Sequence, residues 1–284
     1  MPALTGYFDA SRTDGLIMTV AGYVGGERHW EVFQDEWARV LARYEVPYFH
    51  MNEFCDPNGP YKKWLPAKDH QKQIASFLGA LARAISRSQL KGFGSIVRIK
   101  DLDRFNRENQ LRLEPYPLAV YGCMLWIGKQ NPDAVVSAVF DHIERVSSKL
   151  KRADIYAKSD TYYAGVTDRI QPIPLNKRLT FRDVPAIQAA DFAAWEIRKH
   201  HLNQNEWWEL PDRPKRPDEG LPHLMEWSQR NFGSQLYARK SLDALLESAA
   251  IEGVLWDYNV LCDAHHARNG AWSSPSEKAR DAAR

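Results

Sequence analysis

The sequence predicts an α/β fold, and three observations support this prediction. Short runs rich in β-branched and aromatic residues, typical of buried strands, occur at residues 4–9, 16–24 and 134–141. They alternate with longer segments in which apolar residues recur at three- and four-residue spacing, which is typical of amphipathic helices. The 284 residues, 44% hydrophobic and 26% charged, are enough for one large domain with a substantial core.

The first two strands are expected to form an antiparallel hairpin. The run at residues 4–9 ends in Asp9 and is followed by a turn rich in Ser, Asp and Gly, after which residues 16–24 form the second apolar run. Asp9 thus stands where a buried strand meets a loop. Catalytic groups of α/β enzymes often occupy such positions, but turn-initiating aspartates do so as well, and this pattern alone leaves both interpretations open.

Two helices follow, at residues 29–44 and 69–88, both with an apolar stripe. Between them lies a short apolar run, residues 46–49, which leads into His50 and Glu53, and then a proline-rich loop at 56–66. A third strand is predicted at residues 91–100.

The next elements are a helix at 114–129, with two prolines in its first turn, and a strand at 134–141 that ends in Asp141. A short strand is predicted at 178–181. The alanine-rich segment at 184–200 predicts a closely packed helix that contains Asp191.

The remaining chain differs in composition. Residues 203–222 hold four prolines and two tryptophans, Trp207 and Trp208, and suggest an irregular lid or insertion. We therefore expect a core at 1–200 with an insertion at 27–88, a proline-rich segment with C-terminal helices at 201–262, and a disordered polar tail at 263–284.

Composition also restricts the class of protein. Three widely spaced cysteines argue against a disulfide framework, and no apolar run is long enough to span a bilayer, so we expect a cytoplasmic protein without membrane contact. The net charge of +2 gives no global basic field, so any contact with nucleic acid would need local basic groups. Candidates are the clusters Lys62-Lys63-Trp64, Arg98 with Lys100, and Lys149 with Lys151 and Arg152.

Three aspartates stand out as candidate functional residues: Asp9, Asp141 and Asp191. Asp191 is flanked by alanines that favour an inward-facing helix surface, where an uncompensated charge is costly. One interpretation is that Asp191 pairs with Arg182 or Arg198, or points to solvent. The other is that the three aspartates converge on divalent cations, and such oxygen ligands without cysteine favour Mg²⁺ or Mn²⁺. A zinc site at residues 262–266 is a weaker alternative, because a second cysteine pair is missing.

Three stretches carry a resemblance to a known family: Gly6-Tyr7-Phe8-Asp9-Ala10-Ser11, the segment 46–54, and Pro185-Ala186-Ile187-Gln188-Ala189-Ala190-Asp191-Phe192-Ala193-Ala194. Together they resemble the bacterial and phage family known as domain of unknown function 3800, whose fold is ribonuclease H-like. The family usually has Asp, a second acid, then Ser-Gly. Here Ala10 and Arg12 replace the second acid and the glycine.

The resemblance implies a three-layer fold with a mixed central sheet. Residues 4–9, 16–24 and 91–100 would be its three antiparallel strands, with residues 27–88 inserted between the second and third. The helix at 114–129, the strand at 134–141 and the helix at 184–200 then follow in the order of that fold. Asp9, Asp141 and Asp191 fall on the first strand, the fourth strand and the last helix, where the fold gathers its acidic cluster.

The resulting hypothesis is a metal-dependent phosphodiester hydrolase, a nuclease acting on DNA or RNA. Two divalent cations would activate a water molecule and stabilise the leaving oxygen. His50 or Glu53 could supply a further ligand or a proton relay, although His50 could equally be a hydrogen-bonded structural histidine and Glu53 a plain loop acid. The alternatives are a non-catalytic module that binds nucleic acid or protein, motivated by the missing second acid, and a hydrolase of small phosphorylated molecules.

Overall fold

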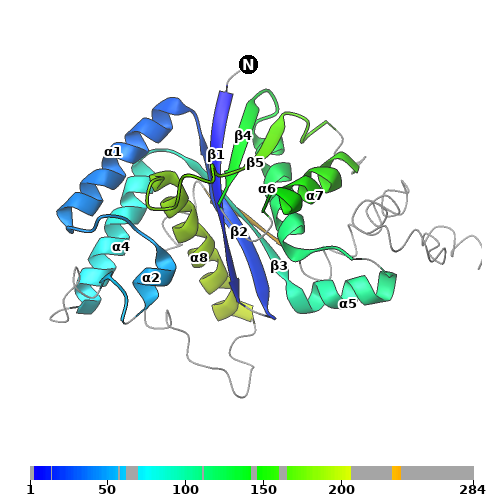
Figure 1. The fold of residues 1–284 in the computed structure, drawn as a ribbon, viewed down its shortest axis with the longest axis horizontal. Coiled ribbons are helices and arrows are strands. Elements are labelled where there is room, and N and C mark those ends of the chain that lie inside the picture. The colour runs from blue at the N-terminus through cyan, green and yellow to red at the C-terminus, as the bar shows by residue number, and fades with distance from the viewer. Residues whose placement is uncertain are drawn as a thin grey trace, which may run out of the picture.

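The computed structural model describes residues 3–13, 15–56, 58–61, 70–110, 112–141, 146–159, 165–205 and 232–237. Within these ranges the protein has an α/β fold with a mixed sheet and seven helices (Figure 1). The strands are β1 (Ala3–Thr13), β2 (Ile17–Gly25), β3 (Lys91–Arg98), β4 (Val135–Phe140), β5 (Ile170–Pro174) and β6 (Phe232–Tyr237). The helices are α1 (Glu27–Arg43), α2 (Met51–Cys55), α4 (His70–Arg87), α5 (Ile99–Asn109), α6 (Pro115–Gln130), α7 (Val146–Ser159) and α8 (Pro185–Asn205).

The sheet has the order β5-β4-β1-β2-β3-β6. β2 is antiparallel to both β1 and β3, whereas β4 pairs with β1 in parallel and β5 with β4 in parallel. Without β6, the order 3-2-1-4-5 is the strand order of ribonuclease H-like sheets, as the resemblance led us to expect. β1 is therefore central, and the helices α1, α2 and α4 all fall between β2 and β3 in the chain.

Helices cover both faces of the sheet (Figure 1). On one face, Phe8 and Phe140 pack with the residues of α6 and α7. α6 is buried almost all round because it lies between the sheet and α7. On the other face, α8 packs along β1 and β2, and the apolar stripes of α1 and α4 complete the core. Successive side chains of a strand point to opposite faces, so each central strand contributes to both cores.

The elements predicted at 4–9, 16–24, 91–100 and 134–141 are strands β1 to β4, and the four predicted helices are α1, α4, α6 and α8. The predicted strand at 178–181 is wrong. The fifth strand is β5, and residues 178–181 form turns, because the side chains of Asn176 and Asp183 accept hydrogen bonds from nearby backbone amides. The apolar run at 46–49 is irregular and leads into α2.

Four further elements, α2, α5, α7 and β6, were not among those predicted. α5 begins directly after β3, where the strand was expected to continue to residue 100, and it buries Leu102 and Phe105. β6 pairs with β3 in parallel. The proline-rich segment, the helical patterns near 224–230 and 241–251 and the polar tail lie outside the described residues. Among the helices that the structure describes, none combines the length and the apolar character needed to cross a membrane.

Candidate functional site

Asp9 and Asp141 are brought together by the pairing of β1 with β4. Phe8 and Phe140 are register partners of these parallel strands, and the Asp141 amide donates a 2.9 Å hydrogen bond to the Phe8 carbonyl oxygen. The two phenylalanine rings stack on the α6 face, with centroids 5.1 Å apart. By strand alternation, Asp9 projects from the opposite face, which α8 covers. Asp9 and Asp141 thus directly follow the last residue pair of the β1–β4 ladder. The prediction that Asp9 stands where its strand ends is wrong, because β1 continues to Thr13 in antiparallel pairing with β2.

Asp191 approaches this edge from α8. Its alanine neighbours allow the helix to pack closely on β1 and β2, and its side chain is only 8% exposed. Oδ2 of Asp191 accepts a 2.6 Å hydrogen bond from the Met51 amide. The solvent-facing alternative for Asp191 is therefore wrong.

The pKa values show that the three carboxyl groups influence one another. Burial, followed by the charges of Asp191 and Asp141, raises the pKa of Asp9 well above its usual range, opposed by the 2.7 Å hydrogen bond from the Ala10 amide to Oδ1. Burial raises the pKa of Asp191 to about 6, and the charge of Asp141 contributes in the same direction. The charge of His50, the Met51 amide and Arg198 act in the opposite direction. The three carboxyl groups thus influence one another electrostatically, and that they share a metal site stays a prediction.

The chemistry of this donor set fits a divalent cation. Clustered carboxylates repel one another, and a hard cation such as Mg²⁺ or Mn²⁺ relieves that repulsion. The amide bonds from Ala10 and Met51 each occupy one carboxylate oxygen, of Asp9 and Asp191 respectively, and leave the second oxygen of each for a ligand. In the part of the chain that the structure describes, however, no group of three or more His, Cys, Asp or Glu side chains is arranged closely enough to hold a metal ion. The described acidic side chains thus do not form a complete metal-binding group in this structure.

Gln188, one helical turn before Asp191, holds the segment at residues 46–51 against α8. Its Oε1 accepts hydrogen bonds from the Phe49 amide and from Nε1 of Trp37, both 2.9 Å, and its Nε2 donates to the Phe181 carbonyl oxygen at 2.9 Å. Gln188 is 1% exposed, so all three bonds form away from water. Residues three apart share a helix face, so Gln188 and Asp191 fasten the same segment.

His50 lies beside Asp191, at the start of α2. Its ring stacks on Phe181 with centroids 4.0 Å apart and an interplanar angle of 17°. Its backbone amide donates to the Tyr61 hydroxyl at 2.9 Å, whereas the buried Nδ1 makes no hydrogen bond with the groups that the structure describes. Nδ1 lies 3.8 Å from Oε1 of Glu53, too far for a hydrogen bond.

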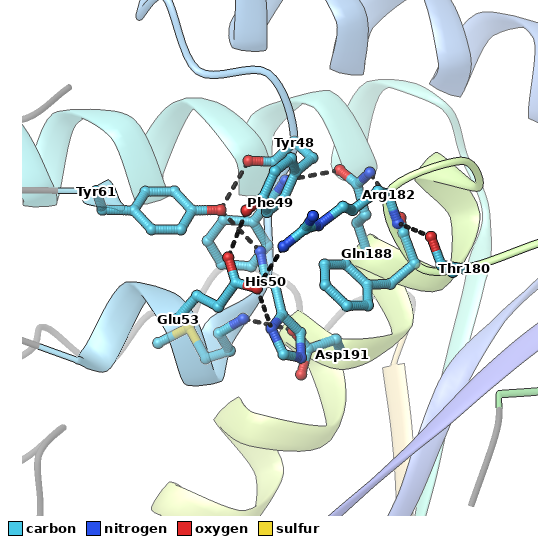
Figure 2. A network of polar contacts seen from close by, with 11 residues as sticks. Tyr48, Phe49, His50, Glu53, Tyr61, Thr180, Arg182, Gln188 and Asp191 are labelled. Atoms are coloured by element: carbon cyan, nitrogen blue, oxygen red, sulfur yellow. Dashed lines mark hydrogen bonds and ion pairs between the residues drawn. The ribbon is translucent and has the colours of Figure 1, made fainter. Parts of the chain in front are cut away.

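Glu53 is engaged on the outer side of this network (Figure 2). Its Oε2 accepts a 2.5 Å hydrogen bond from the Tyr48 hydroxyl, and its Oε1 accepts a 3.1 Å bond from Nη2 of Arg182. The Arg182 guanidinium also lies over the Tyr48 ring, 4.7 Å from its centroid. Of the two accessory residues predicted, His50 therefore faces the acidic site, while Glu53 binds Tyr48 and Arg182.

Neither arginine expected to pair with Asp191 is its hydrogen-bond donor in the structure. Arg182 donates to Glu53, and Nη1 of Arg198 donates to Oγ1 of Thr13 at 3.0 Å. Arg198 still lowers the pKa of Asp191 through its charge. The charge of His50 compensates Asp191 most, followed by the Met51 amide. Sequence spacing does not reveal the Met51 contact, because Met51 lies 140 positions away in the chain.

The basic clusters predicted from the sequence have varied surroundings. Arg98 lies 3.5 Å from Asp101, and Arg152 forms an ion pair with Glu114. Nζ of Lys149 lies 5.8 Å from the ring centroid of Tyr116. Burial, then the charge of Asp9, raises the pKa of Tyr116. Residues 62–64, Trp207 with Trp208, and the possible zinc site at 262–266 lie outside the described residues.

The chain matches no family model, no curated protein and no solved structure. The site must therefore be interpreted from its own residues. Sequence reasoning did not assign a role to Gln188, although its spacing of three from Asp191 was a usable signal. It also assigned no role to the cations Lys177 and Arg178, of which Arg178 falls in the segment 178–181 that was predicted as a strand.

Proposed function

We propose that this protein is a divalent-metal-dependent phosphodiester hydrolase that acts on nucleic acid. The observation that carries the proposal is the setting of Asp9 on β1 and Asp191 on α8, where burial and, after it, the charges of neighbouring carboxylates, Asp141 included, raise the pKa of both groups. Bringing repelling carboxylates together costs free energy, so the arrangement favours a cationic ligand. The strand order and the resemblance to domain of unknown function 3800 support a ribonuclease H-like assignment.

In this proposal each residue of the site has a separate role. Asp9, Asp141 and Asp191 would hold Mg²⁺ or Mn²⁺ through their carboxylate oxygens. A cation in such a site supplies an activated water molecule and stabilises negative charge on the leaving oxygen. α8 excludes water from one side of the carboxylates, and the Met51 and Ala10 amides fix the orientation of Asp191 and Asp9.

His50 is the side chain best placed to move a proton beside this cluster. It lies next to Asp191, and its ring orientation is held by stacking on Phe181 and by the backbone bond to Tyr61. A histidine has the intrinsic pKa for proton transfer near neutral pH. Glu53 would act as a positioning residue, because it binds Tyr48 and Arg182 and its nearer oxygen lies 3.8 Å from His50.

The experiment is to replace each aspartate in turn with Asn and to measure Mg²⁺- and Mn²⁺-dependent cleavage of labelled DNA and RNA. Each variant should lose cleavage while keeping the circular dichroism spectrum of the wild type. The matched control is Asp103→Asn, which removes an exposed carboxylate from α5. Full activity in the three site variants would contradict the assignment.

A second candidate function is a non-catalytic module that binds nucleic acid or protein. Two observations favour it. The described side chains include no group of three or more His, Cys, Asp or Glu that could hold a metal ion. Ala10 stands where the family that the sequence resembles usually has a second acid. Calorimetric titration with Mn²⁺ separates the candidates. Binding that is lost in Asp191→Asn supports the hydrolase, whereas no binding at millimolar metal supports the module. Cleavage of nucleotides but not of polymers would instead indicate a hydrolase of small phosphorylated molecules.

A further inference from the structure

The loop between β5 and α8 borders the acidic site at both of its ends. At its start, the Leu175 amide donates a 2.8 Å hydrogen bond to the carbonyl oxygen of Phe140, the residue directly before Asp141. At its end, Phe181 stacks on His50, and the Phe181 carbonyl oxygen accepts from Gln188 on α8. The loop therefore leads from the neighbourhood of Asp141 to that of Asp191.

The loop holds its own shape. Oδ1 of Asn176 accepts from the Arg178 amide at 3.1 Å, and the Asn176 carbonyl oxygen accepts from the Leu179 amide at 2.9 Å. Oδ2 of Asp183 accepts from both the amide and the hydroxyl of Thr180, at 2.8 Å each. These bonds lower the pKa of Asp183 and commit its carboxylate to Thr180. The backbone that carries Lys177 and Arg178 is thus ordered without help from a ligand.

Positive charge gathers on this ordered loop. Lys177 and Arg178 are exposed, and within the described part of the chain neither side chain forms an ion pair. Arg182 is 56% exposed and is partly neutralised by Glu53. Two exposed cations therefore lie on the loop that starts next to the Phe140–Asp141 segment and ends against His50. Carboxylates repel a polyanion, and only a cation outside the acidic cluster can attract the phosphates on either side of the bond to be cleaved.

We propose that residues 176–182 form a docking loop for the phosphate backbone of a nucleic acid strand, with Lys177 and Arg178 contacting phosphates that flank the acidic site. This inference rests on the proposed function and narrows its substrate class to polymers, because the two cations lie on the exposed rim rather than among the carboxylates. Phosphate contacts of this kind give affinity that falls with salt and carry no sequence information.

The test measures binding separately from cleavage. Fluorescein-labelled single-stranded DNA and RNA oligonucleotides are titrated with the full chain in EDTA, and affinity is followed by fluorescence anisotropy over a range of salt. The variant is Lys177→Gln with Arg178→Gln, which keeps side-chain length and removes two charges. The matched control is Arg28→Gln with Lys91→Gln. It removes two exposed cations at the opposite end of the strands, near the β1–β2 pair Thr5 and Gly25.

Losing two contacts should reduce the slope of log affinity against log salt by about 1.4 and weaken binding about 25-fold at 0.1 M salt, while the control binds as the wild type does. Unchanged affinity and slope in the loop variant, or no binding of either oligonucleotide by the wild type at low salt, would overturn the docking loop. If loop-dependent binding appears without metal-dependent cleavage, the docking loop stands and the hydrolase fails. If the wild type cleaves and the loop variant binds normally, the proposed hydrolase function is supported and the docking loop is refuted.

Discussion

The Met51 amide donates a 2.6 Å hydrogen bond to Oδ2 of Asp191, although the two residues are 140 positions apart in the chain. This bond fastens the segment before α2 to α8 at the residue that we propose as a metal ligand. Asp191 therefore combines a structural role, as a hydrogen-bond acceptor, with an electrostatic one, as a buried charge. Substitutions can separate the two roles, since Asn keeps an acceptor oxygen and loses the charge.

The first prediction concerns the pH dependence of stability without metal. The pKa of Asp191 is about 6 in the folded protein and about 4 in an unfolded chain, so the folded state binds the extra proton between these values. Stability should consequently fall as pH rises from about 4 to 6, and the charge of Asp191 should cost about 3 kcal/mol at pH 7. Asp191→Asn removes this cost.

The measurement is urea denaturation of both proteins in EDTA at a series of pH values. The free energy of unfolding of Asp191→Asn should exceed that of the wild type by more at pH 7 than at pH 4, and saturating Mn²⁺ should stabilise only the wild type. A constant difference across this range would show that Asp191 does not titrate as described. Asp191→Leu serves as the comparison for the structural role, because it leaves the Met51 amide unpaired at a cost of about 1–3 kcal/mol.

The second prediction concerns Gln188, whose side-chain amide joins α1, the segment at 46–50 and the loop before α8. Gln188→Met keeps the volume but leaves the Trp37 and Phe49 donors and the Phe181 acceptor without partners. We expect a loss of about 3 kcal/mol or more in the free energy of unfolding. The control, Gln171→Met on exposed β5, should change it by less than about 0.5 kcal/mol. Equal stability of the two variants would refute the role of Gln188.

Much of the fold could be predicted from the sequence because the apolar patterns of β1, β2, β3 and β4 are local. An apolar periodicity of two residues, typical of strands, or of about three and a half, typical of helices, can be recognised within a few positions of the sequence. The strand predicted at 178–181 was wrong because the structure there depends on side-chain hydrogen bonds from Asn176 and Asp183, which hydrophobic patterns do not record. β5 was missed because most of its residues are exposed and two are prolines.

The candidate site was predictable to a similar degree. A metal site shared by the three aspartates stays a prediction, and Asp9 lies within β1 rather than at its end, because β1 continues to Thr13. The end of β4 before Asp141 and the buried helix face that carries Asp191 were predictable. The partners of Asp191 and Gln188 were not, because they are backbone groups of Met51 and Phe49, and any residue type supplies a backbone amide. Glu53 was grouped with His50 because the two are close in sequence, although its hydrogen bonds are with the side chains of Tyr48 and Arg182.

The third prediction separates a positioning role of Glu53 from a catalytic one. Glu53→Gln removes the ion pair with the exposed Arg182, which is worth less than about 1 kcal/mol, so stability should barely change and cleavage should fall less than about tenfold. Burial and, after it, the Glu53 hydrogen bond raise the pKa of Tyr48, so this pKa should fall in the variant. NMR titration of ¹³C-labelled tyrosine, with Tyr48→Phe to assign the signal, gives that readout. Loss of cleavage as complete as in Asp191→Asn would instead make Glu53 a catalytic residue or a ligand.

The fourth prediction concerns His50, whose ring both stacks on Phe181 and faces Asp191. His50→Phe keeps an aromatic ring against Phe181, and its backbone amide can still donate to Tyr61, so the fold should be retained. Proton transfer is removed, and we expect the kcat of metal-dependent cleavage to fall about 10²- to 10⁴-fold.

A second readout of this variant does not depend on activity. The charge of His50 lowers the pKa of Asp191, so its loss should raise that pKa further and move the pH-dependent fall in stability to higher pH. Phe181→Leu is the matched control, because it weakens the stacking and leaves the imidazole in place. If His50→Phe cleaves as fast as the wild type while Phe181→Leu is impaired, the stacking contact matters and the imidazole does not. The reverse pattern would show that the imidazole itself acts on the reaction, because the variant that keeps the stacked rings would then be slow and the variant with weakened stacking would be fast.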